Sequence, residues 1–160
     1  MLTKEQKEKY MHLAFEQAKK AEEQGEVPIG AVVVDKDGNV IGEGYNRREL
    51  DEDATQHAEM IAIRQACKKL NSWRLVDCSL FITLEPCPMC SGAIINSRLA
   101  EVYYGAFDPK AGAAGSVIDL FKVEKFNHHP KIYGSLFRDQ ASQMLKDFFR
   151  EIRRKQKQDK

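Results

Sequence analysis

Helical and strand-like segments alternate along this chain, and this alternation limits the possible folds more than any other feature of the sequence. Two short strands are predicted at Ile29–Val34 and Val40–Tyr45, and the residues between them, Asp35-Lys36-Asp37-Gly38-Asn39, are typical of a hairpin. A helix is predicted from His57 to Leu70. Further strands are predicted at 79–84 and 101–105, and the first of these runs directly into a helix that ends near residue 96. The alternation predicts an α/β fold.

Helices are also predicted at both ends of the chain. Thr3 and Gln6 fit a capping box, apolar residues follow at helical spacing, and Gly25 supplies a stop signal. A short helix is expected around Val117–Phe121. A long C-terminal helix is predicted at about 137–157 from apolar residues with helical spacing, namely Phe137, Ala141, Met144, Leu145, Phe148 and Ile152.

The composition is that of a globular protein with a core of its own. Hydrophobic residues make up 42% and charged residues 31% of the 160 positions, which excludes a disordered tail or a membrane bundle. The first residues alternate in charge where an export signal needs an apolar stretch, so we expect a cytoplasmic protein without membrane contact and without a disulfide framework. Because no repeat, low-complexity tract or linker interrupts the sequence, we predict a single domain over 1–160.

Positive charge gathers at the C-terminus, although the net charge of the whole chain is only +1. Residues 146–160 contain seven Lys and Arg against three Asp and Glu, a local charge of +4. The remainder of the chain therefore carries −3. A basic segment of this kind is typical of a polyanion contact or of a solvated helix end, and the sequence leaves both open.

Four residues carry the clearest chemical signal: His57, Glu59, Cys87 and Cys90. The cysteines are three apart at the predicted start of a helix, so their sulfur atoms face one side, and a histidine from another helix start can supply a third ligand. Three protein ligands leave the fourth tetrahedral position of zinc open, as in catalytic sites, and thiolates with imidazole favour zinc over magnesium or calcium. Residues two apart on a helix point about 160° away from each other. His57 must therefore lie in the first turn or just before it if Glu59 is to reach the metal.

Each part of this pattern has a second interpretation when taken alone. Cys-x-x-Cys is also typical of a redox dithiol. His57 alone could be a surface or hydrogen-bonded histidine, and Glu59 alone could be a solvated helix residue. Together, His-x-Glu and Pro-Cys-x-x-Cys match the signature of zinc nucleobase deaminases, in which the glutamate is a general acid and base and not a ligand. We therefore expect one Zn²⁺ per subunit on His57, Cys87 and Cys90, with Glu59 as the catalytic residue.

At these motifs the chain resembles the cytidine-deaminase-like superfamily and, within it, the bacterial tRNA-specific adenosine deaminases. The similarity covers nearly the whole chain. The chain departs from the family pattern on both sides of Asn46: Tyr45 stands where a His or similar residue is expected, and Arg47 stands where a Leu is expected. This resemblance implies a three-layer α/β/α domain with a mixed central sheet of about five strands and helices on both faces. The other segments that follow the family pattern are Glu26–Ala31, Ser72–Leu75, Thr83–Cys87, Asp108–Ser116, Phe126–His128 and Phe148–Arg150.

The resemblance also implies a function. It is the hydrolytic deamination of adenosine to inosine at the wobble position of a tRNA anticodon, by a zinc-activated water with Glu59 as the proton shuttle. A homodimer that binds the anticodon stem-loop is implied as well. Substrate contacts are implied for Asn46, Val27, Pro86, Asp108 and Asn127. Contacts with the RNA backbone are expected from Lys110, Arg150, Arg153 and Arg154.

Two other functions stay open from the sequence. One is a small-molecule deaminase of the same superfamily, of the guanine deaminase type, and the other is a non-catalytic zinc or RNA-binding protein. The basic C-terminal segment and the segments 108–116 and 126–128 favour the tRNA branch over the small-molecule enzyme. The presence of Glu59, which is not a metal ligand, argues against a non-catalytic protein.

Overall fold

The computed structural model describes residues 2–159, and within this range the chain forms four α-helices, one 3₁₀ helix and five strands. The helices are α1 (Lys4–Glu23), α2 (Ala58–Leu70), α3 (Pro88–Asn96), η1 (Leu120–Lys122) and α4 (Arg138–Gln158). The strands are β1 (Gly30–Val34), β2 (Val40–Tyr45), β3 (Ser79–Leu84), β4 (Glu101–Ala106) and β5 (Lys131–Tyr133). The expected α/β fold is confirmed.

The five strands form one mixed sheet in the order β2-β1-β3-β4-β5. Strand β1 is antiparallel to both β2 and β3, whereas β4 is parallel to β3 and β5. The predicted hairpin joins β1 to β2, and its turn is held by Asp35, whose carboxylate accepts hydrogen bonds from the backbone N–H groups of Asp37 and Asn39. Helix α3 provides the crossover between the parallel strands β3 and β4, as parallel pairing requires.

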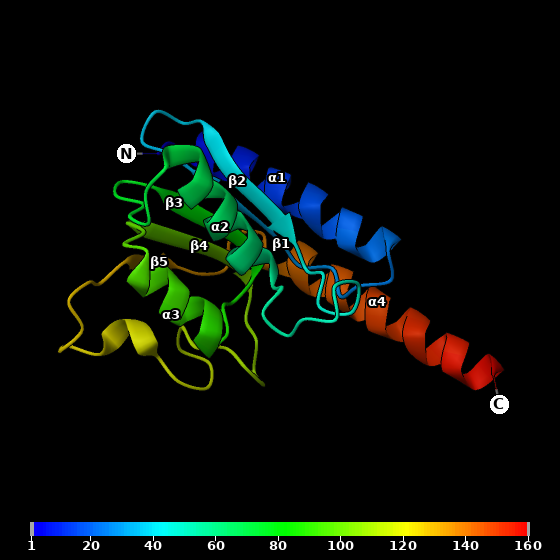
Figure 1. Ribbon diagram of the computed structural model, residues 1–160. Helices are drawn as coiled ribbons and strands as arrows, with labels where there is room; N and C mark the ends of the chain where they lie inside the picture. The colour runs from blue at the N-terminus through cyan, green and yellow to red at the C-terminus, as the bar shows by residue number, and fades with distance from the viewer. Residues whose placement is uncertain (1, 160) are drawn as a thin grey trace.

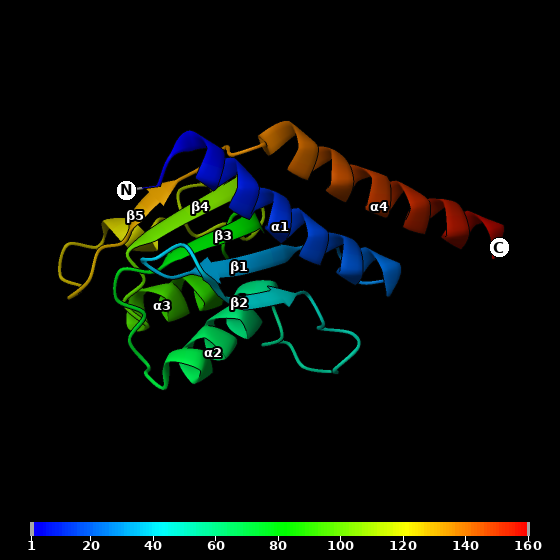
Figure 2. The same ribbon diagram turned by 90° about the horizontal axis from the view of Figure 1, so that it is seen from above.

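Helices cover both faces of the sheet, so the molecule has three layers (Figures 1 and 2). Side chains of β1 alternate between the two faces: Ala31 and Val33 pack with α2 and α3, and Val32 and Val34 pack with α1 and α4. Both faces are therefore buried, which explains why β1 is apolar at every position instead of alternating with polar residues. The expected three-layer architecture is confirmed.

Close packing against the sheet positions the two helices that carry the candidate metal ligands. Helix α2 approaches β2 so closely that a Cβ atom on Gly42 would lie 2.1 Å from the carbonyl oxygen of Ala62. His57 is the N-cap residue of α2 and Cys87 is the N-cap residue of α3. His57 therefore lies just before the first turn, as the argument from helix geometry requires.

Three segments differ from the expectations. The short helix expected around 117–121 is a 3₁₀ helix at 120–122, because the Asp119 side chain accepts a hydrogen bond from the Phe121 N–H and caps the turn there. The resemblance implied about five strands, but no sequence pattern located β5, and α4 begins and ends one residue later than predicted. The predicted domain span includes Met1 and Lys160, which lie outside the described residues. Within residues 2–159, no helix combines the length and the apolar character needed to cross a bilayer.

Candidate active site

A cavity of about 520 Å³ opens where β3 and β4 end and where α2 and α3 begin. This volume is typical of pockets for small molecules or single nucleotides. The cavity brings together seven of the site residues expected from the sequence: Val27, Asn46, His57, Glu59, Cys87, Asp108 and Lys110. It is also lined by residues that the sequence did not single out, including Arg48, Glu85, Phe107, Leu145 and Phe149.

The three expected metal ligands form one cluster. His57 Nδ1 lies 3.6 Å from Cys87 Sγ and 3.5 Å from Cys90 Sγ, and all three ligand atoms lie within 4.8 Å of one another. With Zn–S bonds near 2.3 Å and a Zn–N bond near 2.0–2.1 Å, tetrahedral coordination requires a nitrogen–sulfur separation of about 3.6 Å. Both observed separations match this requirement, so the donor set fits zinc in spacing as well as in chemistry.

The three ligand groups also perturb one another's protonation. The hydrogen bond from Cys90 lowers the pKa of Cys87 to about 4, with a further contribution from His57. The contact with Cys87 raises the pKa of His57, and the same neighbour together with burial raises the pKa of Cys90. A thiolate at Cys87 is therefore favoured over a thiol even without a metal ion. Because the thiolate is the form of cysteine that binds metals, Cys87 is prepared for a cation, whereas Cys90 must first release its proton.

Glu59 lies in the first turn of α2 and reaches the same cavity. Its side chain is buried, with 4% exposure, and this burial raises the pKa of its carboxyl group to about 6. A carboxyl group that titrates near the working pH can both accept and donate a proton, which is the property of an efficient general acid and base.

Asn46 follows β2 and is held from both ends of its amide group. Its Nδ2 donates to the carbonyl oxygen of Val27 at 3.3 Å, and its Oδ1 accepts from the backbone N–H of Arg48 at 3.2 Å. These bonds fix the orientation of the amide. One N–H and one oxygen lone pair are left for a ligand, which is enough to contact one base edge.

The loop after β4 forms the opposite wall of the cavity, and Glu85 holds it in place. Glu85 is buried, with 2% exposure, and its carboxyl group accepts from the backbone N–H groups of Asp108, Ala114 and Ser116 and from the Ser116 hydroxyl. A Cβ atom on Gly112 would lie 2.3 Å from Glu85 Oε2, so the loop fits closely around this group. The sequence signal that could have pointed to this role of Glu85 was an acidic residue at the end of an apolar strand.

Other expected site residues lie outside the cavity. Pro86 is buried and does not line it, and its carbonyl oxygen accepts from the Ala113 N–H at 2.8 Å. Asn127 is exposed in the segment before β5 and does not line it either. Asn127 precedes the start of β5, which lies beside the start of β4. The cavity lies at the opposite end of β4.

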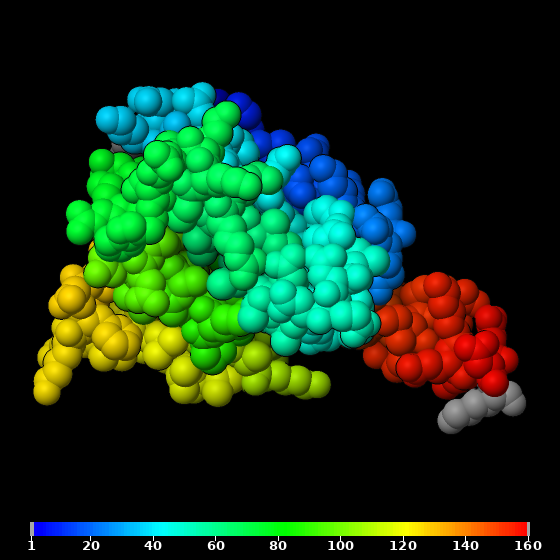
Figure 3. All heavy atoms as spheres, viewed as in Figure 1, coloured from blue at the N-terminus to red at the C-terminus, as the bar shows by residue number. Residues whose placement is uncertain are grey.

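The three arginines with expected RNA contacts are exposed on α4, whose C-terminal half projects from the body of the molecule (Figures 2 and 3). Arg150 is paired with Asp147 at 3.4 Å, and Arg154 with Glu151. Arg153 makes no ion pair within residues 2–159. The sequence did not reveal that Leu145 and Phe149 bring α4 to the cavity itself.

Comparisons with known proteins agree with this site. A model of the MafB19-like deaminase family matches residues 5–153. The chain is 48% identical to the tRNA-specific adenosine deaminase of Bacillus subtilis over 95% of its own length and 94% of that protein. A solved structure from work on A-to-I editing by tRNA:A34 deaminases at the wobble position of transfer RNA has a TM-score of 0.82 and 43% identity, covering 86% of this chain and 99% of the other. A guanine deaminase structure from Bacillus subtilis has a TM-score of 0.61 and 40% identity, covering 75% and 74%. The chain therefore belongs to the tRNA-specific adenosine deaminases, within the MafB19-like deaminase family.

Proposed function

We propose that this protein deaminates adenosine to inosine at the wobble position of a tRNA anticodon. The observation that carries the proposal is a His/Cys/Cys cluster of zinc spacing beside a buried glutamate: His57, Cys87 and Glu59 line one cavity, and Cys90 is buried next to it. The extent of the similarity to a tRNA-specific adenosine deaminase supports this substrate over a free base, because it covers nearly the full length of both chains. The similarity to the guanine deaminase covers three quarters of each chain.

His57, Cys87 and Cys90 would hold one Zn²⁺ per subunit. When bound, zinc would lower the pKa of a water molecule and so supply a nucleophile at neutral pH. Glu59 would take one proton from that water and deliver it to N1 of adenine, and would then pass the second proton, from the oxygen now bonded to C6, to the departing amine. The reaction consumes one water and releases one ammonia for each inosine formed.

The cavity walls would orient the base during these proton transfers. The free N–H and lone pair of Asn46 would read a base edge, and Val27 and Asp108 would complete the substrate contacts. Lys110 lies at the cavity and is exposed, which suits a contact with the RNA backbone. On α4, Arg150, Arg153 and Arg154 would extend that contact along the anticodon stem-loop.

We further propose a cytoplasmic homodimer that is built from single-domain subunits. Apolar side chains are exposed at Val117, Ile118, Val123 and Phe126, between 36% and 54%, and a second copy would cover them. Asn127 directly follows this apolar segment, so its expected substrate contact would be made in the partner's cavity. Sedimentation velocity tests this association.

The function is tested with purified protein and three substrates: total tRNA, free adenosine and free guanine. We expect inosine in tRNA and no ammonia from guanine. Glu59→Gln should lower inosine formation by about 10²–10⁴-fold with an unchanged zinc content, because it removes a proton carrier and leaves every ligand in place. Ammonia from guanine without inosine in tRNA would replace this function with that of a small-molecule deaminase.

A further inference from the structure

The loop between β2 and α2, residues 46–57, joins two parts of the active site. It begins at Asn46, the expected base contact, and ends at His57, an expected metal ligand. Position 47 in this loop and position 45 just before it are among the places where the chain departs from the expected family pattern. We therefore asked what the side chains of Tyr45 and Arg47 contact.

Both side chains belong to a hydrogen-bonded chain whose centre is Asp51. The Asp51 carboxylate accepts from Arg47 Nε at 2.9 Å, from Arg47 Nη2 at 3.1 Å and from Gln56 Nε2 at 2.7 Å. Arg47 is the residue after Asn46, and Gln56 is the residue before His57. One carboxylate therefore connects the neighbour of the base contact with the neighbour of the metal ligand.

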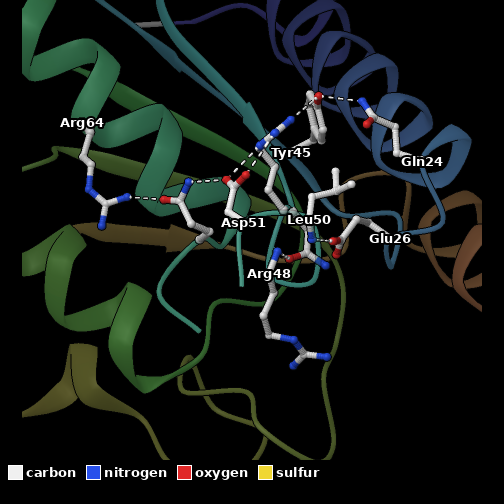
Figure 4. Close-up of polar contacts among 10 residues, drawn as sticks. Gln24, Glu26, Tyr45, Arg48, Leu50, Asp51 and Arg64 are labelled. Carbon is white, nitrogen blue, oxygen red and sulfur yellow. Dashed lines mark hydrogen bonds and ion pairs between the residues drawn. The ribbon is translucent and has the colours of Figure 1, made fainter. Parts of the chain in front are cut away.

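The chain of hydrogen bonds is anchored at both ends in helices. Arg47 Nη1 donates to the Tyr45 hydroxyl at 2.7 Å, and Gln24, at the C-cap of α1, donates to the same hydroxyl at 3.0 Å. At the other end, Arg64 of α2 donates to Gln56 Oε1 at 2.7 Å. Figure 4 shows Gln24, Tyr45, Asp51 and Arg64 along one line of contacts, while the side chain of Arg48 points away from it.

The exposure of the central ion pair indicates what it does for the protein. The side chains of Arg47 and Asp51 are partly exposed, at 34% and 29%, and an ion pair at the surface contributes little to global stability. The guanidinium holds the pKa of the Asp51 carboxyl below its usual value, so the pair is charged at neutral pH. The two ends of the 46–57 loop are also joined directly, because the Arg47 N–H donates to the Gln56 carbonyl oxygen at 3.0 Å. The ion pair therefore adds a side-chain link through Asp51 to this main-chain link.

We propose that Arg47 and Asp51 are positioning residues that hold Asn46 and His57 at a fixed separation across the cavity. The measurement of activity on tRNA rests on the proposed function, whereas the measurement of zinc affinity does not. Loss of the pair would loosen the metal ligand and the base contact together. Partners that orient metal ligands typically change affinity or activity by about 10–100-fold, and a pair that acts through the backbone should lie near the lower figure.

The test compares Asp51→Ala with Glu49→Ala. Each removes one carboxylate from the same loop, so their long-range effects on RNA affinity are matched. Glu49 lies outside the hydrogen-bonded chain, has 71% side-chain exposure and makes one ion pair, to Arg48 at 3.6 Å. Asp51→Ala should lower zinc affinity, measured by chelator competition, by about tenfold and kcat/KM on tRNA by a similar factor. Glu49→Ala should change neither, and both melting temperatures should stay within about 4 °C of the parent.

Two further variants make the result decisive. Arg47→Lys keeps the charge but cannot donate two parallel hydrogen bonds, so it should show the same losses as Asp51→Ala. The double variant Arg47→Lys/Asp51→Ala should be no worse than either single variant, because each already breaks the same unit. Equal zinc affinities for Asp51→Ala and Glu49→Ala, or fully multiplicative losses in the double variant, would overturn the inference. If the parent protein forms no inosine, the proposed function fails while the zinc measurement still decides the role of the pair.

Discussion

Glu85 offers a direct test of how the cavity wall is held. Its carboxyl group accepts four hydrogen bonds from the loop after β4, three of them from backbone N–H groups. In Glu85→Gln, the amide oxygen can keep the N–H groups of Ala114 and Ser116, and the amide nitrogen can donate to the Ser116 hydroxyl, so the Asp108 N–H is the donor that loses its acceptor. A buried donor without a partner costs about 1–3 kcal/mol, so the variant should lose about 1–3 kcal/mol of unfolding free energy. For a chain of this length, that corresponds to a fall of roughly 3–10 °C in melting temperature.

The effect should also be local, and this can be measured. Asp108, Ala114 and Ser116 donate their amide hydrogens to Glu85, so these amides should exchange slowly with solvent in the parent protein, and that of Asp108 should exchange faster in the variant. Ser116→Ala is the matched control, because it removes the hydroxyl contact and leaves all three backbone bonds, with an expected cost of about 1–2 kcal/mol. A Glu85→Gln protein that melts within 2 °C of the parent and keeps the same amide protection would refute this account.

Two other predictions concern the basic helix and the buried glutamate. A chain that ends after Phe149 keeps the cavity but loses Arg150, Arg153 and Arg154. The slope of log tRNA affinity against log salt should therefore flatten by about 2, which corresponds to two or three phosphate contacts. Equal slopes for both chains would mean that this helix end is only solvated. Burial raises the pKa of Glu59 from 4.5 to about 6, so the folded state binds this proton more tightly than the unfolded state and loses stability as the pH rises through that window. In metal-free protein, Glu59→Gln should therefore add about 2 kcal/mol to the unfolding free energy at pH 8 and almost nothing at pH 4.5, as measured by urea denaturation; a gain of the same size at both pH values would contradict the assignment to burial.

The sequence predicted those parts of the fold that depend on local patterns. The hairpin could be predicted because Asp35 to Asn39 combine turn formers between two apolar runs, and the start of α3 because Pro88 fits a first helical turn. Strand β5 could not be predicted, since its three residues carry no pattern of their own and are ordered by pairing with β4. The type and bounds of the 3₁₀ helix could not be predicted for a related reason: the Asp119 side chain caps it, and apolar spacing does not record such a bond.

For the site, spacing and chemistry identified the residues that form the cluster but not those that support it. His57, Cys87 and Cys90 could be grouped because metal ligands have restricted chemistry and spacing. Glu85 and Asp51 could not, because a buried or bridging carboxylate is recognised only from the donors that the fold brings to it. The chain position of a residue also says nothing about which end of the sheet it reaches, and for this reason the sequence did not exclude Asn127 from the cavity.

The cap positions of His57 and Cys87 have an electrostatic consequence. Each residue stands at the N-terminus of its helix, where the aligned peptide dipoles are equivalent to about half a positive charge. Figure 1 shows both helices on the same face of the sheet, and His57 and Cys87 line the same cavity. Such a field favours a thiolate over a thiol, in the same direction as the lowered pKa of Cys87. Cys87 would therefore have no proton to release on binding zinc, whereas Cys90 and His57, whose pKa values are raised, would still have to release theirs. Zinc uptake should therefore weaken as the pH falls because of Cys90 and His57, and not because of Cys87.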